Sequence, residues 1–216
     1  MNPFPISPRG MIFDLDGTLL DTEPLYTDAA QKILDPFGHT YTLELKRRVI
    51  GGNSLRSAQI TIDEFGLPMT AEEYLKQRES HLLTLFPEAE EINGAGRFLH
   101  HAADRGITLG VATSSHKHLY ELKTGRREWK TLFSTVICGD DDRLRNSKPA
   151  PDIFLLCAEQ MSISPSDIIA FEDSRNGIEA ARAAGMYVVA IESPYTLPED
   201  LEGANMTAPD FQALIV

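Results

Sequence analysis

The sequence predicts an α/β fold in which a parallel sheet has helices on both faces and an all-helical segment is inserted after the first strand. From about residue 92 onward, short apolar runs alternate with helical patterns, which is typical of parallel strands joined by crossover helices. Residues 21–91 show only the helical spacing of apolar residues. We therefore expect a core domain formed by residues 1–20 and 92–216 and a helical cap domain formed by residues 21–91.

The expected elements can be placed along the chain in order. The first strand is Met11–Phe13, which is apolar on both faces, as in a strand covered by helices on each side. In the insertion, helices are expected from residues 25, 43, 55 and 71, and a glycine or proline follows each of them. In the core, helices are expected at 94–105, 119–129, 152–161, 177–184 and 211–214, and strands at 107–112, 135–138, 168–171 and 187–191. This alternation is that of a Rossmann-like core.

The amino-acid composition limits the kinds of binding partner and the cellular compartment that we expect. The chain has 216 residues, 42% of them hydrophobic, and a formal net charge of −12. This acidity argues against broad nucleic-acid or anionic-membrane surfaces, because those require basic patches. Cys138 and Cys157 lie in apolar runs and favour free thiols in a reducing compartment. Since we find no signal-peptide pattern and no apolar stretch of membrane length, we expect a cytoplasmic monomer, with a dimer as the alternative.

The strand Met11–Phe13 ends in two carboxylates, Asp14 and Asp16, which Gly17 follows. Side chains at positions i and i+2 of an extended chain share one face, so these acids would repel each other unless a cation or a shared proton compensates them. A divalent metal ion is the simplest compensation. The structural alternative is an Asp-Gly turn without a site, which would account for a D-x-D-G stretch taken alone.

Polar residues also follow other predicted strands. Thr113 and Ser114 follow the second core strand and offer a hydroxyl and backbone N–H groups, which suit a phosphoryl group and equally fit a helix N-cap. Lys148 precedes a helix beside two prolines, where a fixed positive charge could meet an anion. Glu172 and Asp173 follow the fourth core strand. Ligands of open α/β sheets bind beyond the carboxyl ends of the strands, so these residues predict one site.

Together these stretches resemble the haloacid dehalogenase-like (HAD) phosphohydrolases. The string from Asp14 to Thr22, D-L-D-G-T-L-L-D-T, is similar at every position to the first motif of that family. Thr113, the K-P-A-P stretch from Lys148 and the E-D-S stretch from Glu172 resemble the second, third and fourth motifs, in the family's order. The helical insertion resembles the cap of the β-phosphoglucomutase and phosphoglycolate-phosphatase group.

The resemblance implies a phosphatase that works through an aspartyl-phosphate. It implies that Asp14 is the nucleophile and that Asp16 is the general acid for the leaving group and then the base for water. It also implies that Lys148 stabilises the nucleophile. Thr113 and the Ser114 amide would bind the transferred phosphoryl group together with Lys148.

The same resemblance implies Mg²⁺ as the cofactor. The ion would be held by Asp14, the carbonyl oxygen of Asp16 and Asp173. Glu172 would be either a direct ligand or a partner of the ligands, because adjacent side chains on an extended segment point in different directions.

A further similarity implies a small phosphorylated substrate. Three stretches outside the motifs resemble the branch that contains pseudouridine-5′-phosphatase and DL-glycerol-3-phosphatase: 21–26, 122–133 and 139–141. The substrate would then be a nucleoside, sugar or polyol monophosphate, such as pseudouridine 5′-phosphate or glycerol 3-phosphate. In the cap, Gly51, Gly52 and Asn53 occupy the expected specificity loop, and His116 could reach the substrate from the core.

Two alternatives stay open from the sequence. A β-phosphoglucomutase-type enzyme would return the phosphoryl group to a sugar, although Tyr26 stands where that mutase has a histidine. A non-catalytic HAD-like binding module would not need to keep Asp14, Asp16, Lys148 and Asp173 together.

Overall fold

The chain divides by its internal contacts into two compact units. The computed structural model describes residues 4–49 and 54–215. The larger unit consists of Met1–Asp21 and Glu90–Val216, and the smaller unit is Thr22–Ala89. The sequence-based boundaries of independently folding domains stay a prediction. Among the helices that the structure describes, none combines the length and apolar character needed to cross a bilayer.

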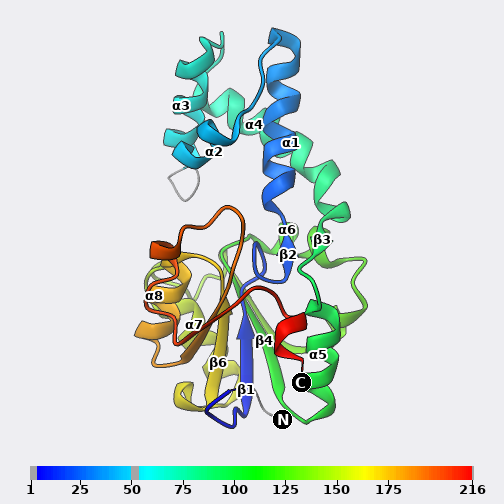
Figure 1. The fold of residues 1–216 in the computed structure, drawn as a ribbon, viewed down its shortest axis with the longest axis vertical. Helices are drawn as coiled ribbons and strands as arrows, with labels where there is room; N and C mark the ends of the chain where they lie inside the picture. The colour runs from blue at the N-terminus through cyan, green and yellow to red at the C-terminus, as the bar shows by residue number, and fades with distance from the viewer. Residues whose placement is uncertain (1–3, 50–53, 216) are drawn as a thin grey trace. The chain divides into compact units, whose positions relative to one another are not determined.

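The larger unit is built on a parallel sheet, as predicted (Figure 1), and the sheet has six strands, one more than expected. Its strand order is β5-β4-β1-β6-β7-β8. Strand β1 therefore lies between β4 and β6, and the carboxyl ends of these three strands are neighbours. The strands are β1 Gly10–Phe13, β4 Thr108–Thr113, β5 Phe133–Cys138, β6 Ile168–Glu172, β7 Tyr187–Ile191 and β8 Met206–Ala208.

Helices cover both faces of the sheet. Successive β1 side chains point to opposite faces, so each face of β1 packs against a different layer of helices. Ile12 packs in an apolar cluster with residues of α7 (Asp152–Met161) and α8 (Arg175–Ala183). Phe13 faces the other way, where it stacks on Phe171 at a ring distance of 4.6 Å. Helix α5 (Ala95–Asp104) covers that second face (Figure 1).

The smaller unit is all-helical in its described residues, as predicted. Its own apolar cluster includes Ile33, Ile62 and Tyr74, which come from three different helices. Thr70 and Glu73 form a reciprocal capping box that begins the longest helix. The elements are α1 Glu23–Leu34, η1 Asp35–Phe37, α2 Leu43–Val49, α3 Ser54–Phe65, α4 Ala71–Leu85 and η2 Phe86–Glu88.

Several elements differ from the sequence-based expectation. The helix expected at 119–129 is shorter, because α6 (Lys117–Thr124) ends before Gly125 and a 3-10 segment, η3 (Glu128–Leu132), follows. A two-stranded antiparallel ladder joins β2 (Leu20–Asp21) to β3 (Glu90–Glu91). Strands of two residues are too short to show a period, so β2 and β3 were not predicted. The remaining short segments are η4 Pro165–Asp167, η5 Pro198–Asp200 and, in place of a final α-helix, η6 Gln212–Leu214.

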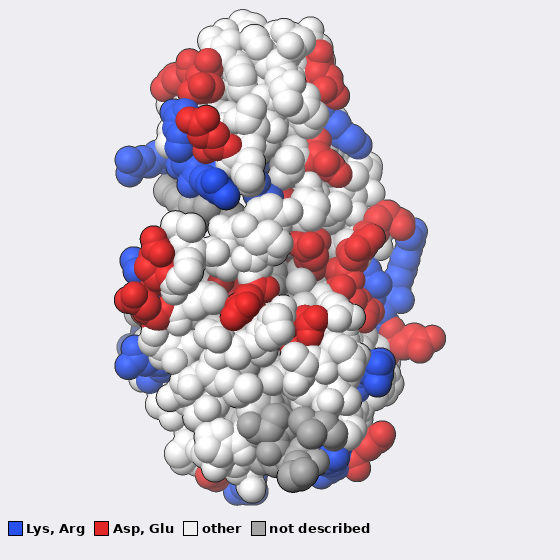
Figure 2. Space-filling model, viewed as in Figure 1, with Lys and Arg blue, Asp and Glu red and all other residues white. Residues whose placement is uncertain are grey.

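The surface charges fit the acidic composition. Figure 2 shows acidic and basic side chains interspersed over the face that it draws. This pattern differs from the continuous basic surface that nucleic-acid binding requires.

Candidate active site

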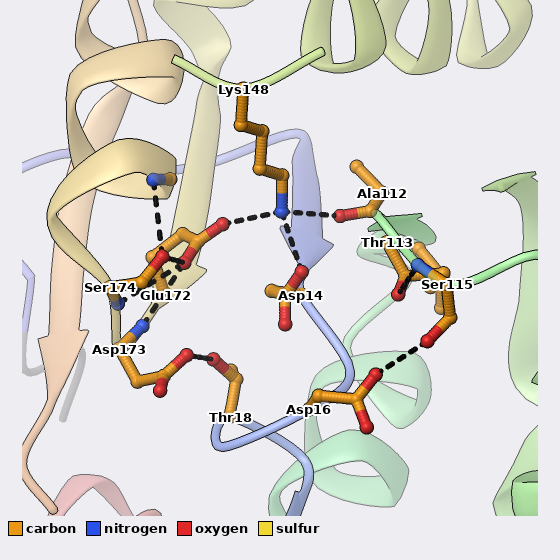
Figure 3. Close-up of polar contacts among 12 residues, drawn as sticks. Asp14, Asp16, Thr18, Ala112, Thr113, Ser115, Lys148, Glu172, Asp173 and Ser174 are labelled. Atoms are coloured by element: carbon orange, nitrogen blue, oxygen red, sulfur yellow. Dashed lines mark hydrogen bonds and ion pairs between the residues drawn. The ribbon is translucent and has the colours of Figure 1, made fainter. Parts of the chain in front are cut away.

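The predicted site begins where β1 ends. Asp14 follows β1 directly, and its backbone N–H donates to the Phe171 carbonyl oxygen at 3.0 Å, which fixes Asp14 beside β6. Because β6 continues into Glu172 and Asp173, the parallel register brings three acids to one end of the sheet. Figure 3 shows Asp14 and Glu172 in contact with Lys148, and Asp173 below them in contact with Thr18.

Lys148 binds two buried carboxylates, Asp14 and Glu172, at the ends of the neighbouring strands β1 and β6. Its ammonium donates to Asp14 Oδ1 at 2.5 Å, to Glu172 Oε1 at 2.6 Å and to the Ala112 carbonyl oxygen at 2.9 Å. An ammonium has three donors, so each finds an acceptor. Burial alone would lower the pKa of Lys148, but the charges of Asp14 and Glu172 outweigh it and raise that pKa above its usual value. Lys148 is therefore a fixed positive charge.

The acids nevertheless carry more negative charge than Lys148 offsets. Burial, together with the charges of Glu172 and Asp16, raises the pKa of Asp14 to about 7 despite Lys148. Burial and the neighbouring Glu172 and Asp14 raise the pKa of Asp173 well above its usual value. One ligand oxygen from each of Asp14, Glu172 and Asp173 lies within 4.8 Å of the others. Hard oxygen donors with excess negative charge fit Mg²⁺.

Glu172 is occupied by protein donors on both oxygens. Besides the Lys148 contact to Oε1, Oε2 accepts from the Ser174 hydroxyl at 3.1 Å and from the Asp173 N–H at 3.2 Å. A Cβ on Gly177 would lie 1.9 Å from the Glu172 carboxyl carbon, so α8 can approach only with glycine there. These contacts fit an anchor for Lys148.

Gly17 leaves room for Asp173. Its φ of +82° is in the left-handed region that favours glycine, and a Cβ there would lie 2.1 Å from Asp173 Oδ2. The next residue, Thr18, donates its hydroxyl to Asp173 Oδ1 at 3.1 Å. The turn after Asp16 thus shapes the space beside the carboxylates.

Asp16 has a different set of partners. The Ser115 hydroxyl donates to Asp16 Oδ2 at 2.7 Å, as Figure 3 shows, and the Lys123 ammonium donates to Oδ1 at 2.6 Å. Sequence reasoning gave Lys123 no role, although it lies in one of the stretches that resemble the phosphatase branch. Its place in that stretch was the only feature of the sequence that could have indicated a role for Lys123.

The other predicted residues lie near the end of β4. Thr113 is buried, and its hydroxyl oxygen accepts from the Ser115 N–H at 3.0 Å. Ser114 is exposed, and so is His116, whose ring makes an edge contact with His118. No contact places His116 among the acids in the described structure. The predicted substrate residues Gly51, Gly52 and Asn53 lie outside the described residues.

Comparison with known proteins identifies the family. The haloacid dehalogenase-like hydrolase family matches residues 11–191, which is most of the chain. The chain belongs to this family. This HAD hydrolase is an enzyme, as the sequence predicted, and its class is that of the phosphoric monoester hydrolases. The non-catalytic module is thereby set aside.

Several relatives of this HAD hydrolase bear phosphatase names. It is 43% identical over 187 residues to a Drosophila melanogaster protein described as a probable pseudouridine-5′-phosphatase, covering 85% of this chain and 81% of that protein. It is 40% identical over 190 residues to (DL)-glycerol-3-phosphatase 2 of Arabidopsis thaliana, covering 85% and 79%. A Thermotoga maritima crystal structure described as a putative β-phosphoglucomutase matches with a TM-score of 0.81 at 29% identity, covering 92% of this chain and 93% of that chain.

Proposed function

We propose that this HAD hydrolase removes the phosphoryl group from a small phosphorylated metabolite, with Asp14 as the nucleophile. The observation that carries the proposal is the 2.5 Å contact between Lys148 Nζ and Asp14 Oδ1 at the carboxyl end of the central strand. A buried ammonium in this place keeps the attacking carboxylate oriented and favours its ionised form. Phosphoryl transfer asks mainly for such positioning and for compensation of charge.

The proposed reaction has two steps. A carboxylate oxygen of Asp14 attacks phosphorus, the bond from phosphorus to the leaving oxygen breaks, and Asp16 gives that oxygen its proton. Water then attacks the phosphorus of the aspartyl-phosphate, Asp16 takes a proton from the water, and the bond from phosphorus to Asp14 breaks. Inorganic phosphate leaves, and both aspartates return to their starting forms.

Lys148, Thr113 and the Ser114 amide would bind the phosphoryl oxygens. Lys148 supplies positive charge beside Asp14, and Thr113 supplies a hydroxyl at the end of β4. The Ser114 amide would add a backbone donor. Charge on the phosphoryl oxygens grows in the transition state, so fixed donors there lower the barrier.

We further propose that the acids hold Mg²⁺. Asp14, Asp173 and the carbonyl oxygen of Asp16 would be the ligands, whereas Glu172 would act through Lys148 and the loop amides, because its oxygens already accept protein donors. When bound, the ion neutralises charge on the phosphoryl group and keeps Asp14 ionised. The three carboxylates and the raised pKa values of Asp14 and Asp173 support this choice.

For the substrate we propose a nucleoside, sugar or polyol monophosphate. The relatives described as pseudouridine-5′-phosphatase and glycerol-3-phosphatase favour pseudouridine 5′-phosphate and glycerol 3-phosphate. The likeness to a structure described as a β-phosphoglucomutase keeps a mutase as the second candidate. The smaller, all-helical unit would act as the cap that selects among these substrates.

A substrate panel tests the proposal. The purified protein is incubated with pseudouridine 5′-phosphate, glycerol 3-phosphate, glucose 1-phosphate and 4-nitrophenyl phosphate, each with Mg²⁺ and with a chelator. We expect Mg²⁺-dependent release of inorganic phosphate, with kcat/KM of about 10⁴ M⁻¹ s⁻¹ or more for the preferred metabolite. Conversion of glucose 1-phosphate to glucose 6-phosphate without phosphate release would instead support the mutase. Phosphate release that a chelator does not reduce would contradict the role of Mg²⁺.

A further inference from the structure

Lys123 is a buried lysine that the reaction described above does not use. Its side chain is 0% exposed, and its ammonium donates to Asp16 Oδ1 at 2.6 Å and to Ser115 Oγ at 2.9 Å. Ser115 in turn donates to Asp16 Oδ2 at 2.7 Å. The three side chains therefore close a triangle in which each carboxylate oxygen of Asp16 has its own donor.

Lys123 lies on the buried face of its helix, where a charged side chain is less favourable for stability than an apolar one. Tyr120, Lys123 and Thr124 form the buried face of α6, with the i, i+3, i+4 spacing that apolar side chains usually occupy. An ammonium taken out of water costs free energy that a well-packed apolar side chain would avoid. A methionine would fill this position without that cost, so stability alone does not explain why a lysine stands here.

We propose that Lys123 is a positioning residue for the acid–base step, holding the Asp16 carboxylate in the direction required for proton transfer. The proposal rests on the proposed function of Asp16. A carboxylate at the rim of a site otherwise rotates among several orientations, and proton transfer needs one of them. Two donors on two different oxygens fix both the position and the plane of the carboxylate.

Ser115 connects this arrangement to the phosphoryl site. Its hydroxyl belongs to the triangle, and its backbone N–H donates to the hydroxyl oxygen of Thr113 at 3.0 Å. The end of β4 thus orients the proposed phosphate-binding hydroxyl and, through Ser115 and Lys123, the proposed acid. Figure 3 shows Thr113, Ser115 and Asp16 on one side of Asp14, opposite Glu172 and Asp173.

The experiment compares leaving groups that do and do not need a proton. Glycerol 3-phosphate releases a strongly basic alkoxide, whereas 4-nitrophenyl phosphate releases a weakly basic phenolate. We measure kcat/KM, which reports transfer to Asp14, for the natural protein, Lys123→Met, Ser115→Ala and Asp16→Asn. As a matched control, Lys130→Met removes a lysine that pairs at the surface with Glu121.

Lys123→Met is expected to lower kcat/KM for glycerol 3-phosphate roughly 30-fold, a part of the 10²–10⁴-fold effect of a general acid. The loss on 4-nitrophenyl phosphate should stay below about threefold, since that leaving group needs little proton donation. Ser115→Ala should show the same selectivity with a smaller loss. Lys130→Met should leave both values unchanged. Thermal unfolding and near-ultraviolet circular dichroism check that each variant folds.

A double variant shows whether Lys123 acts through Asp16. If it does, adding Lys123→Met to Asp16→Asn should cost less than about twofold more on glycerol 3-phosphate, because the acid is already absent. Equal losses on both substrates, an additive double variant, or a gain in rate with Lys123→Met would overturn the proposal. Should Lys123→Met fail to fold, the selectivity of Ser115→Ala alone decides it. Absence of selectivity in Asp16→Asn would instead overturn the proposed role of Asp16.

Discussion

Two lysine–aspartate pairs sit at the end of the sheet, and they differ in how they are buried. Lys148 and Asp14 are both nearly inaccessible, and Lys148 also compensates Glu172, whose side chain is 1% exposed. Lys123 is equally buried, yet the side chain of its partner Asp16 is 26% exposed. The Lys148–Asp14 pair is therefore enclosed, whereas the Lys123–Asp16 pair is partly open to solvent at Asp16.

The difference matches the proposed division of work. A nucleophile must stay ionised and fixed, which suits an enclosed carboxylate held by an ammonium and a metal ion. An acid and base must exchange its proton with the leaving group and with water, which suits a carboxylate that is oriented but partly solvated. The same pair of residue types thus serves two roles because the second partners and the exposure differ.

The largest expected effect is the loss of activity in Asp14→Asn, which should differ from the effect of Asp16→Asn. Asp14→Asn should abolish turnover of both 4-nitrophenyl phosphate and glycerol 3-phosphate, because no covalent intermediate can form. Asp16→Asn should retain much of kcat/KM toward 4-nitrophenyl phosphate only, because kcat/KM reports transfer to Asp14, whereas kcat also falls with the loss of the base for water. Steady-state rates with both substrates check this, and residual turnover by Asp14→Asn on either substrate would break the distinction.

Replacing each lysine by methionine should affect the two pairs differently, both in kcat/KM and in the free energy of unfolding. Lys148→Met should lower kcat/KM for both substrates by about 10²–10³-fold, since it removes charge that stabilises the transition state. It should also destabilise the metal-free protein by about 3 kcal/mol, because Glu172 is left buried without its cation. Lys123→Met should destabilise it far less, since water can solvate Asp16. Urea unfolding measures both, and equal destabilisation would count against the comparison.

Gly17→Ala should disturb the metal site without touching either lysine. The added Cβ would meet Asp173 Oδ2, so we expect Mg²⁺ to bind about tenfold more weakly, as when partners of metal ligands are changed. Gly185→Ala is the matched control, because Gly185 has a φ of +83° but open space around its Cβ position. Isothermal titration with Mg²⁺ compares them. Similar weakening in both variants would show a strain effect unrelated to Asp173.

The smallest expected effect is a pH dependence that arises at Asp14 and Asp173. The folded, metal-free protein holds protons on Asp14, whose pKa is about 7, and on Asp173, whereas the unfolded chain releases them near the ordinary value of 3.8. These groups therefore lower stability as pH rises from about 4 to about 7, and at a pH below about 7 Mg²⁺ must displace their protons in order to bind. The increase in unfolding temperature caused by Mg²⁺ should be larger at about pH 8 than at about pH 5.5. A pH-independent increase would contradict this.

Much of the enclosed pair could be predicted from the sequence. Asp14, Glu172 and Asp173 each follow an apolar run, and parallel strands end at one edge, so their meeting follows from fold class. Lys148 could be predicted from its resemblance to a family motif. The parallel sheet and the helical insertion followed from the periodicity of apolar residues, because their strands and helices are long enough to show it.

The second pair could not be predicted in the same way. Lys123 is 107 positions from Asp16, and a lysine on a helix is ordinarily exposed. Its burial depends on how α6 packs, which the local pattern does not encode. The helix itself was predicted too long, since Gly125 was not recognised as its end. Strand β8 and the β2–β3 ladder were missed because they are very short.

The account depends most on covalent transfer to Asp14. The protein is mixed with substrate and Mg²⁺, quenched in acid within milliseconds, reduced with borohydride to trap an acyl phosphate, and digested for mass spectrometry. We expect Asp14 to be converted to homoserine in the natural protein, in an amount that rises in variants slowed in the second step, and no conversion in Asp14→Asn. Rapid phosphate release without any modified Asp14, or modification of another carboxylate, would contradict the account.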